Sequence, residues 1–177
     1  MLAIYPDATD IICPLIRGGQ FHNPVRITTT SLNCEKKAVC DINHFFSKEI
    51  GCMLQYSETD PNQVAFLWIH PEARDSSKEF QVPCIGACCF YRQESGYELQ
   101  WVWLHPYWRG RGLLSEAWPK FISEFGEFDV EPPITKAMAA FLKKHGFKMT
   151  ERFKHTQRMF LRYDSFDSRW ASLESCR

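Results

Sequence analysis

The segment 98–114, ELQWVWLHPYWRGRGLL, constrains the fold of this chain more than any other. Its first seven residues are rich in apolar and aromatic side chains in a pattern typical of a strand, which ends at His105-Pro106. A six-residue loop with glycines at 110 and 112 follows, and a helical pattern begins after it. The sequence therefore predicts a strand, a glycine-containing loop and a helix in direct succession.

This arrangement is suited to hold an anion. The first N–H groups of a helix have no partner within the helix, and the helix dipole places partial positive charge there. Glycines let the backbone come close to phosphate oxygens, and Arg109 and Arg111 add two cationic side chains. The same residues also fit an exposed basic turn, with Gly112 serving only helix entry. The loop reads neither GxxxxGKS/T nor GxGxxG, so a nucleoside-triphosphate loop and a dinucleotide fold are disfavoured.

The rest of the chain changes between helical and strand patterns. Apolar residues three and four apart predict a helix over 35–50, with Gly51 as its C-cap. Strands are expected at 25–30, 64–69, 85–91 and 98–104. Short polar connections between the last three strands favour an antiparallel meander. Beyond the loop we expect, in order, a helix to about 125, a strand at 128–131, a helix at 135–145 and a strand within 148–162.

Two of these helices carry more detailed expectations. Pro119 lies inside the helix that follows Gly112, which predicts a kink or a short first turn. The apolar face of this helix is expected to comprise Leu114, Trp118, Phe121, Ile122 and Phe125. The inner side of the helix over 135–145 is expected to comprise Ala137, Ala140 and Phe141, with Gly146 as the C-cap.

The overall composition narrows the class of protein. Lys plus Arg total 21 and Asp plus Glu total 21, so no global basic surface favours nucleic acid or a membrane surface as partner. Aromatic residues make up 15% of the chain, which argues against disorder. No apolar run approaches the ~20 residues that span a bilayer. The first residues carry Asp7 and Asp10 without a basic leader, so we expect a cytoplasmic protein rather than a secreted one.

Eight cysteines are numerous for a chain of this length. The nearest approach to a metal set is Cys34, Cys40, His44 and Cys52. This set lacks the CxxC spacing of zinc sites, so we expect no metal. Cys84, Cys88 and Cys89 lie in an apolar run, where free cysteine acts as a small buried hydrophobe. A redox- or metal-responsive protein and a catalytic Cys–His pair remain as alternatives.

The run from Leu104 to Leu114 resembles the acyl-CoA binding motif of the GNAT superfamily of N-acyltransferases. Residues 109–113 match the first five places of the motif's hexapeptide, and Leu114 stands at the sixth, where glycine or alanine is usual. Lys144, Gly146 and Phe147 match a second family signature near the end of the last helix. The resemblance covers roughly residues 63–163.

The resemblance implies an α+β fold, with a mixed, mostly antiparallel twisted sheet flanked by helices and with its fourth and fifth strands splayed apart. The GNAT domain would span 34–163, after an N-terminal extension or first strand over 1–33 and before a C-terminal tail over 164–177. The co-substrate would be acetyl-CoA. Its pantetheine arm would pair with Trp103, Leu104 and His105 of the fourth strand. Its pyrophosphate would bind the amides of Arg109, Gly110, Arg111, Gly112, Leu113 and Leu114.

For catalysis, the resemblance places a base at Glu98 near the start of the fourth strand. Strand alternation would put Glu98, Gln100, Val102 and Leu104 on one face, and Leu99, Trp101, Trp103 and His105 on the other. A solvated carboxylate after a turn is the alternative for Glu98. The tyrosine that often protonates the departing thiolate is replaced by Leu142, so the usual general acid is missing. Thr135 holds a place where the family often has asparagine, and it also fits an ordinary N-cap.

We therefore expect an N-acetyltransferase that transfers the acetyl group directly to a primary amine. The acceptor, a small molecule or a protein, and the oligomeric state stay open. A catalytically reduced GNAT-fold protein that binds CoA or regulates a partner is the alternative. Four aromatic residues near the motif either line an acceptor pocket, stack on adenine or pack in the core: Trp101, Trp103, Tyr107 and Trp108.

Overall fold

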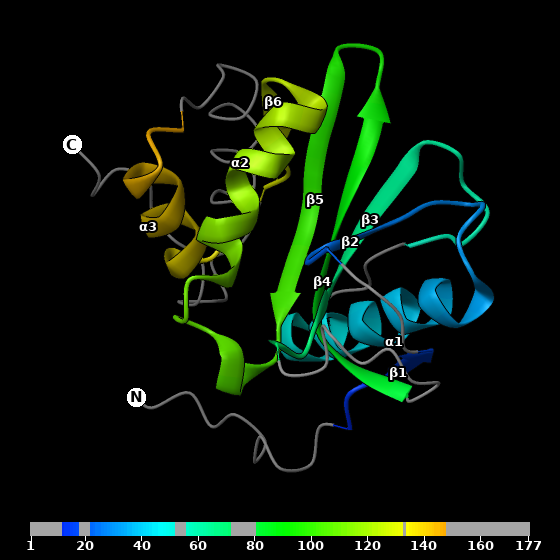
Figure 1. The fold of residues 1–177 in the computed structure, drawn as a ribbon. Helices are drawn as coiled ribbons and strands as arrows, with labels where there is room; N and C mark the ends of the chain where they lie inside the picture. The colour runs from blue at the N-terminus through cyan, green and yellow to red at the C-terminus, as the bar shows by residue number, and fades with distance from the viewer. Residues whose placement is uncertain (1–11, 18–21, 52–55, 72–80, 133, 148–177) are drawn as a thin grey trace. The chain divides into compact units, whose positions relative to one another are not determined.

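A computed structural model describes residues 12–17, 22–51, 56–71, 81–132 and 134–147 (Figure 1). The chain divides into two compact units, Met1–Glu127 and Phe128–Arg177, and each is described by itself. The strand expected within 148–162 and the tail expected over 164–177 lie outside the described residues. In the part of the chain that is described, no helix is long and apolar enough to cross a bilayer.

The first unit is built on an antiparallel sheet. Its strands are β1 (Leu15–Arg17), β2 (Val25–Ile27), β3 (Gln63–Ile69), β4 (Gln81–Gln93) and β5 (Gly96–Leu104). β3, β4 and β5 follow one another as antiparallel neighbours, which confirms the predicted meander. β2 pairs with β3 and β1 pairs with β4, again antiparallel, so the stretch before residue 33 contributes two short strands. The predicted α+β class with a mostly antiparallel sheet is confirmed.

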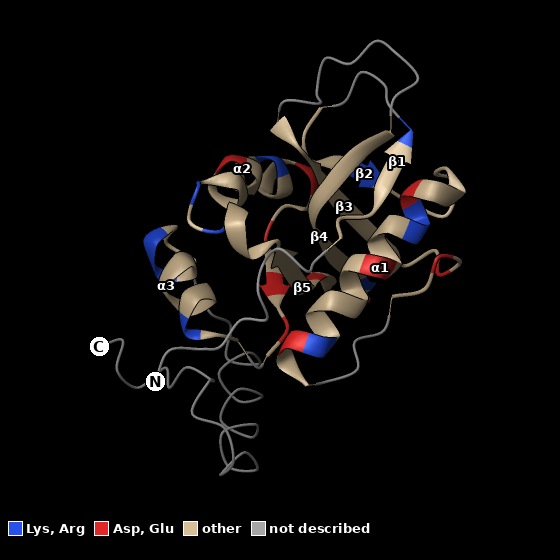
Figure 2. Ribbon diagram, turned by 90° about the horizontal axis from the view of Figure 1, so that it is seen from below, with Lys and Arg blue, Asp and Glu red and all other residues tan. Residues whose placement is uncertain are grey.

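Helix α1 (Asn33–Ile50) covers one face of this sheet (Figure 1). It begins where the Glu35 side chain accepts a hydrogen bond from the Leu32 N–H, at 3.0 Å. It ends at Gly51, whose φ of 69° is left-handed, as predicted for the C-cap. Its buried residues Ala38, Val39 and Ile42 join one core cluster with alternate residues of β3 and β4. Figure 2 shows ribbon segments of both charges, blue and red, along α1.

Helix α2 (Leu113–Phe125) packs an aromatic surface against the other face of the sheet. The ring of Phe121 lies 4.8 Å from that of Phe66 in β3 and 5.1 Å from that of Phe90 in β4. Pro119 stands inside the helix, which begins six residues before it and continues beyond it. One residue of the expected apolar face is misassigned, because Ile122 is 44% exposed.

Strand β5 contains a β-bulge that the sequence pattern did not predict. Leu99 pairs with Phe90 and Trp101 pairs with Cys89, so Gln100 is an extra residue without a counterpart in β4. Because Phe90 and Cys89 are consecutive in β4, their partners Leu99 and Trp101 lie on opposite faces of the sheet. An extra residue therefore shifts the alternation of β5 by one position.

The predicted grouping of Glu98 with Val102 and Leu104 is wrong for this reason. Trp101 and Trp103 belong to the core cluster on the α1 side of the sheet. Since the alternation shifts at the bulge, Glu98 shares the α1 side with Trp101 and Trp103. The carboxylate thus lies on the face that α1 covers, and not on the face packed against α2.

The second unit contributes β6 (Phe128–Val130) and α3 (Lys136–Lys144). The Thr135 hydroxyl accepts from the Met138 N–H at 3.2 Å, so Thr135 acts as the N-cap. Gly146 has a φ of 65°, and the Phe147 N–H donates to the Leu142 carbonyl at 3.0 Å, which closes the helix one residue before the expected C-cap.

The inner side of α3 differs from the expectation. Ala139 and Leu142 are buried, whereas Ala137 and Ala140 are exposed. Alanine side chains are short, so the apolar pattern could not indicate which face of this helix is buried. The predicted splay concerns β5 and β6. These strands belong to different units, so the splay stays a prediction.

Candidate functional site

The loop between β5 and α2 is held at its first residue by the sheet. The His105 N–H donates to the Ile85 carbonyl at 2.8 Å, and the His105 Nδ1 accepts from the Tyr107 N–H at 3.3 Å. A single 3-10 turn, Pro106–Trp108, follows. His105 is only 8% exposed, so it supports the loop from inside.

Two glycines shape the second half of the loop. Gly110 has a φ of 72° and Gly112 a φ of 86°, a region that L side chains rarely adopt. Gly112 is the N-cap of α2 and supplies no side-chain acceptor to the amides behind it. The N–H groups of Leu113 and Leu114 therefore lie at an uncapped helix start, with the positive end of the dipole. This is the geometry predicted from the sequence for an anion site.

The amide of Arg109 has a different role. It donates to the Pro106 carbonyl at 3.3 Å within the 3-10 turn. The candidate phosphate-binding amides thus narrow to residues 110–114. A Cβ built on Gly110 would meet no atom of the described residues within 4 Å, so this part of the loop backbone is open to approach.

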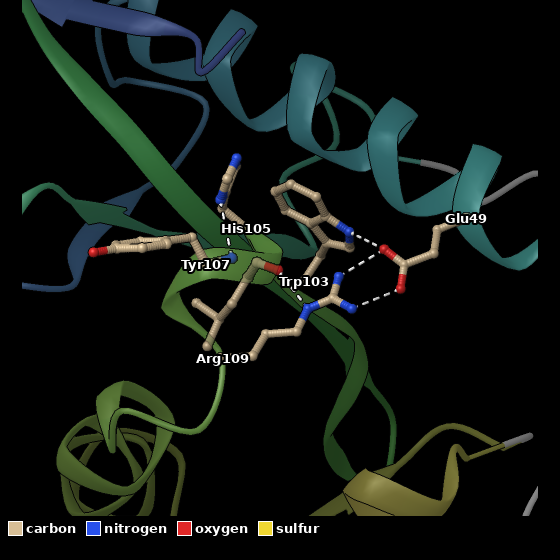
Figure 3. Close-up of polar contacts among 6 residues, drawn as sticks. Glu49, Trp103, His105, Tyr107 and Arg109 are labelled. Atoms are coloured by element: carbon tan, nitrogen blue, oxygen red, sulfur yellow. Dashed lines mark hydrogen bonds and ion pairs between the residues drawn. The ribbon is translucent and has the colours of Figure 1, made fainter. Parts of the chain in front are cut away.

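The Arg109 side chain turns back onto the protein (Figure 3). Its Nε donates to the Leu104 carbonyl at 2.8 Å. Its two terminal nitrogens donate to the two oxygens of Glu49, at 2.8 and 2.6 Å. Glu49 Oε2 also accepts from the indole N–H of Trp103 at 2.7 Å. Arg109 is therefore bound by a forked ion pair and a backbone carbonyl.

Glu49 is a functional candidate that the sequence reasoning missed. It lies in the last turn of α1 and is separated from Arg109 by 60 residues, so no local motif connects the two. Partial burial acts to raise the pKa of Glu49, but hydrogen bonds from Arg109 and Trp103 and the charge of Arg109 outweigh it. The pKa of Glu49 consequently lies below its ordinary value.

Arg111 is exposed and lies against the aromatic residues of the 3-10 turn. The centre of its guanidinium lies 4.1 Å from the ring centroid of Tyr107 and 5.1 Å from that of Trp108. Tyr107 is itself 60% exposed. A cation–π contact uses the charge of the guanidinium and does not use its N–H groups as hydrogen-bond donors. Tyr107, Trp108 and Arg111 form the outer surface of the loop.

The end of β5 is the part predicted to pair with pantetheine. Its successive backbone N–H groups point alternately toward β4 and toward the opposite edge of the strand. Because the His105 N–H bonds to Ile85 of β4, the antiparallel pattern points the Leu104 N–H to the opposite edge of β5. Trp103 and Leu104 also lie close to Gly86 of β4. A Cβ on Gly86 would stand 2.7 Å from the Trp103 carbonyl oxygen. Of the three predicted pairing residues, Leu104 has the N–H that faces away from β4.

Glu98 lies at the other end of β5 from this loop. Six residues separate it from Leu104, roughly 20 Å of strand at about 3.3 Å per residue. Glu98 is half-buried and accepts a hydrogen bond from Gln93 Nε2. Gln100, in the bulge, accepts from Gln63 Nε2 at 3.3 Å and from the Cys89 thiol at 3.8 Å. The structure thus brings Trp103, His105 and Arg109 together and leaves Glu98 near the hairpin.

The aromatic residues near the motif divide into two groups. Trp101 and Trp103 are buried in the core cluster, which confirms the packing interpretation for both. Tyr107 and Trp108 belong to the loop surface instead. Leu142, which the sequence resemblance matched to a tyrosine of the GNAT superfamily, is 3% exposed in the second unit and offers no proton.

Cys84 and Cys88 are buried in the core, and Cys40 is partly buried. Burial raises the pKa of Cys84 to about 12, and burial together with a hydrogen bond to Glu58 raises that of Cys40 to about 12. Burial also raises the pKa of Cys88. These thiols are protonated at neutral pH and are poor nucleophiles and poor metal ligands. The described residues hold no group of three or more metal-ligating side chains, and Cys52 lies outside them.

The chain resembles known proteins at the level of structure. No protein-family model and no curated protein matches the chain. A solved structure described as "Crystal structure of a probable acetyltransferase" is similar at 15% identity, over 75% of this chain and 93% of that chain, with a TM-score of 0.45. A likeness of this size leaves the function of the chain to be argued from its own residues.

Proposed function

We propose that this chain binds acetyl-CoA at the loop between β5 and α2 and transfers the acetyl group to a primary amine. The observation that carries the proposal is the loop itself. Gly110 and Gly112 have positive φ angles directly before an uncapped helix start, and Arg111 is exposed beside them. Backbone amides, a helix dipole and a cation at one place are the features that hold a phosphate group.

The successive parts of acetyl-CoA would lie along this surface in order. Its pyrophosphate would bind the amides of residues 110–114, with Arg111 as the side-chain cation. Its pantetheine arm carries amide groups, and these would pair with the Leu104 N–H at the edge of β5. For Glu98 to act on the acceptor, the arm would have to run along β5 from Leu104 toward the bulge at Gln100. Trp103 and His105 would support this edge from the core rather than contact the arm.

The chemistry requires a neutral amine. The amine nitrogen attacks the thioester carbonyl, a C–N bond forms, and the C–S bond breaks as the CoA thiolate leaves. Glu98 is the candidate base that takes the amine's proton, directly or through water. Since Leu142 is apolar, we propose that water protonates the thiolate.

Two measurements test the proposal. Calorimetric titration of the full chain with acetyl-CoA is expected to show saturable binding, and the release of free thiol is expected when amines of several classes are supplied. The panel should include an aminoglycoside, a polyamine, free lysine and a peptide with a free N-terminus. Absence of binding at millimolar acetyl-CoA would contradict the proposal. Glu98→Gln should remove the acidic limb of the pH–rate profile, and an unchanged profile would exclude Glu98 as base.

A binding protein without turnover is the second candidate, and two residues favour it. Leu142 occupies the place of the usual acid, and Leu114 stands where glycine or alanine is usual in the motif. Such a protein would bind CoA and regulate or recruit a partner. Saturable CoA binding together with no thiol release across the amine panel would support this candidate over the enzyme.

A further inference from the structure

The two arginines of the loop have different surroundings. Arg109 donates from all three guanidinium nitrogens, to Leu104 and to both oxygens of Glu49. A phosphate group approaching Arg109 would have to compete with this forked carboxylate pair. Arg111 is exposed, and its contacts with Tyr107 and Trp108 are cation–π contacts rather than hydrogen bonds. Arg111 is therefore the arginine whose charge a ligand can meet.

Glu49 is attached to a rigid part of the molecule. The helix that carries it is fixed to the sheet by Ala38, Val39 and Ile42, each at most 1% exposed. Its carboxylate receives a third hydrogen bond from Trp103, a residue buried in β5. The guanidinium of Arg109 also lies over the Trp103 ring, 5.7 Å from its centroid. Helix α1, strand β5 and the loop thus meet at one carboxylate (Figure 3).

We infer that Glu49 is a positioning residue: through Arg109 it holds the loop 105–112 in the form that binds a CoA phosphate group. The inference rests on the proposed function, because it assigns how that same site is built. Arg109 then serves as a structural clamp, and Arg111 is the side-chain cation offered to the ligand.

The direction in which CoA affinity changes when Glu49 is replaced distinguishes a positioning role from a purely electrostatic one. If Glu49 acted only as a negative charge beside an anion site, its removal would tighten CoA binding. If it positions the loop, its removal weakens binding, because the amides of residues 110–114 lose their fixed arrangement. Glu49→Gln is nearly isosteric, so it removes the charge with little change of volume.

The first experiment is a calorimetric titration of the full chain with coenzyme A. Glu49→Gln is expected to raise the Kd about tenfold. Asp41→Asn is the matched control, since it removes from the same helix a carboxylate whose ion-pair partner among the described residues is the exposed Lys37, at 3.1 Å. Its Kd should equal that of the wild type. Arg109→Gln should weaken binding as much as Glu49→Gln, and the double variant should bind no more weakly than either.

The second experiment reads the contact itself. The indole N–H resonance of Trp103 is assigned by its loss in Trp103→Phe. This resonance is expected to shift as Glu49 is protonated below pH 4.5, because 4.5 is the ordinary pKa of a glutamate and that of Glu49 is lower. His105 is also titratable and lies beside Trp103, with ring centroids 6.2 Å apart. Glu49→Gln keeps His105 and should abolish the shift that belongs to Glu49.

The outcomes separate the two proposals. Wild-type protein that binds no CoA at millimolar concentration would overturn the proposed function, and this inference with it. Wild-type binding with a Kd for Glu49→Gln within threefold of its value, or a lower one, would overturn the positioning role alone. A Trp103 resonance whose acid shift persists in Glu49→Gln would do the same. A weakened Kd, a non-additive double variant and a lost shift together support it.

Discussion

The two faces of the meander β3–β4–β5 differ in chemistry. The face under α2 is aromatic, with Phe66, Phe90 and Phe121 in contact through their rings. The face under α1 includes polar contacts among its apolar residues. Glu49 bonds to Trp103 at one end of β5, and Gln100 accepts hydrogen bonds near the other.

This difference indicates where each task of the molecule resides. An aromatic face contributes stability through burial and close packing. The α1 face carries the bulge, the Glu49–Arg109 ion pair and the half-buried Glu98. Desolvation of these polar groups costs stability, yet the arrangement places titratable groups along β5. Both the proposed base and the proposed positioning residue lie on the α1 side.

The largest expected effect belongs to the aromatic face. Phe121→Ala removes a side chain with 0% exposure, and we expect a loss of about 4 kcal/mol in the free energy of unfolding. Urea denaturation measures it. Ile122→Ala is the matched control on the next residue, which is 44% exposed, and should change stability by less than about 0.5 kcal/mol. Similar losses for the two variants would refute the account of this face.

Gly86→Ala tests the close approach of β4 and β5 at the proposed site. The new Cβ would stand 2.7 Å from the Trp103 carbonyl oxygen, so β5 must shift. We expect a loss of about 2 kcal/mol in stability and a weaker CoA affinity. Stability within about 0.5 kcal/mol of the wild type would show that β5 adjusts without strain.

Because of the Glu49–Arg109 pair, we expect the free energy of unfolding to depend on pH in the acidic range. The pKa of Glu49 is lower in the folded chain than its ordinary 4.5, so its stabilisation is present above pH 4.5 and is lost as pH falls through the folded pKa. Because both side chains are about one-third exposed, at 32% and 33%, we expect only about 1 kcal/mol. Wild type should be more stable than Glu49→Gln at pH 7, and the difference should shrink as pH falls below 4.5 through the folded pKa of Glu49. A constant difference would contradict the assignment.

The smallest effect is expected for an exposed ion pair on the same helix. Lys37 and Asp41 stand four residues apart, with side chains 71% and 42% exposed. Asp41→Asn should lower the free energy of unfolding by about 0.4 kcal/mol, and added salt should reduce even this difference. A loss equal to that of Glu49→Gln would mean that burial and forked geometry add nothing at Glu49.

Local patterns predicted the local parts of this structure. The C-cap at Gly51, the strands of the meander and the loop into α2 each follow from residues that are neighbours in sequence. The bulge at Gln100 was not predictable, because its cause is the register with β4. The same holds for the Glu49–Arg109 pair, which joins residues far apart in the chain.

The candidate site was therefore foreseen only in part. The glycines and Arg111 have the surroundings that the sequence suggested, whereas Arg109 proved to be engaged by the protein. The face of Glu98 was misjudged, since strict alternation fails after an extra residue. Residue type alone could not tell which of two arginines in one loop would face solvent.

The central claim is that the loop between β5 and α2 binds the phosphate end of CoA. Titration of the ¹⁵N-labelled full chain with coenzyme A, followed by amide resonances, tests it most directly. We predict saturable shifts concentrated at Leu104 and residues 110–114, with little change at the amides of α1 around Asp41. Absence of shifts at millimolar coenzyme A, or shifts concentrated elsewhere in the chain, would contradict the claim.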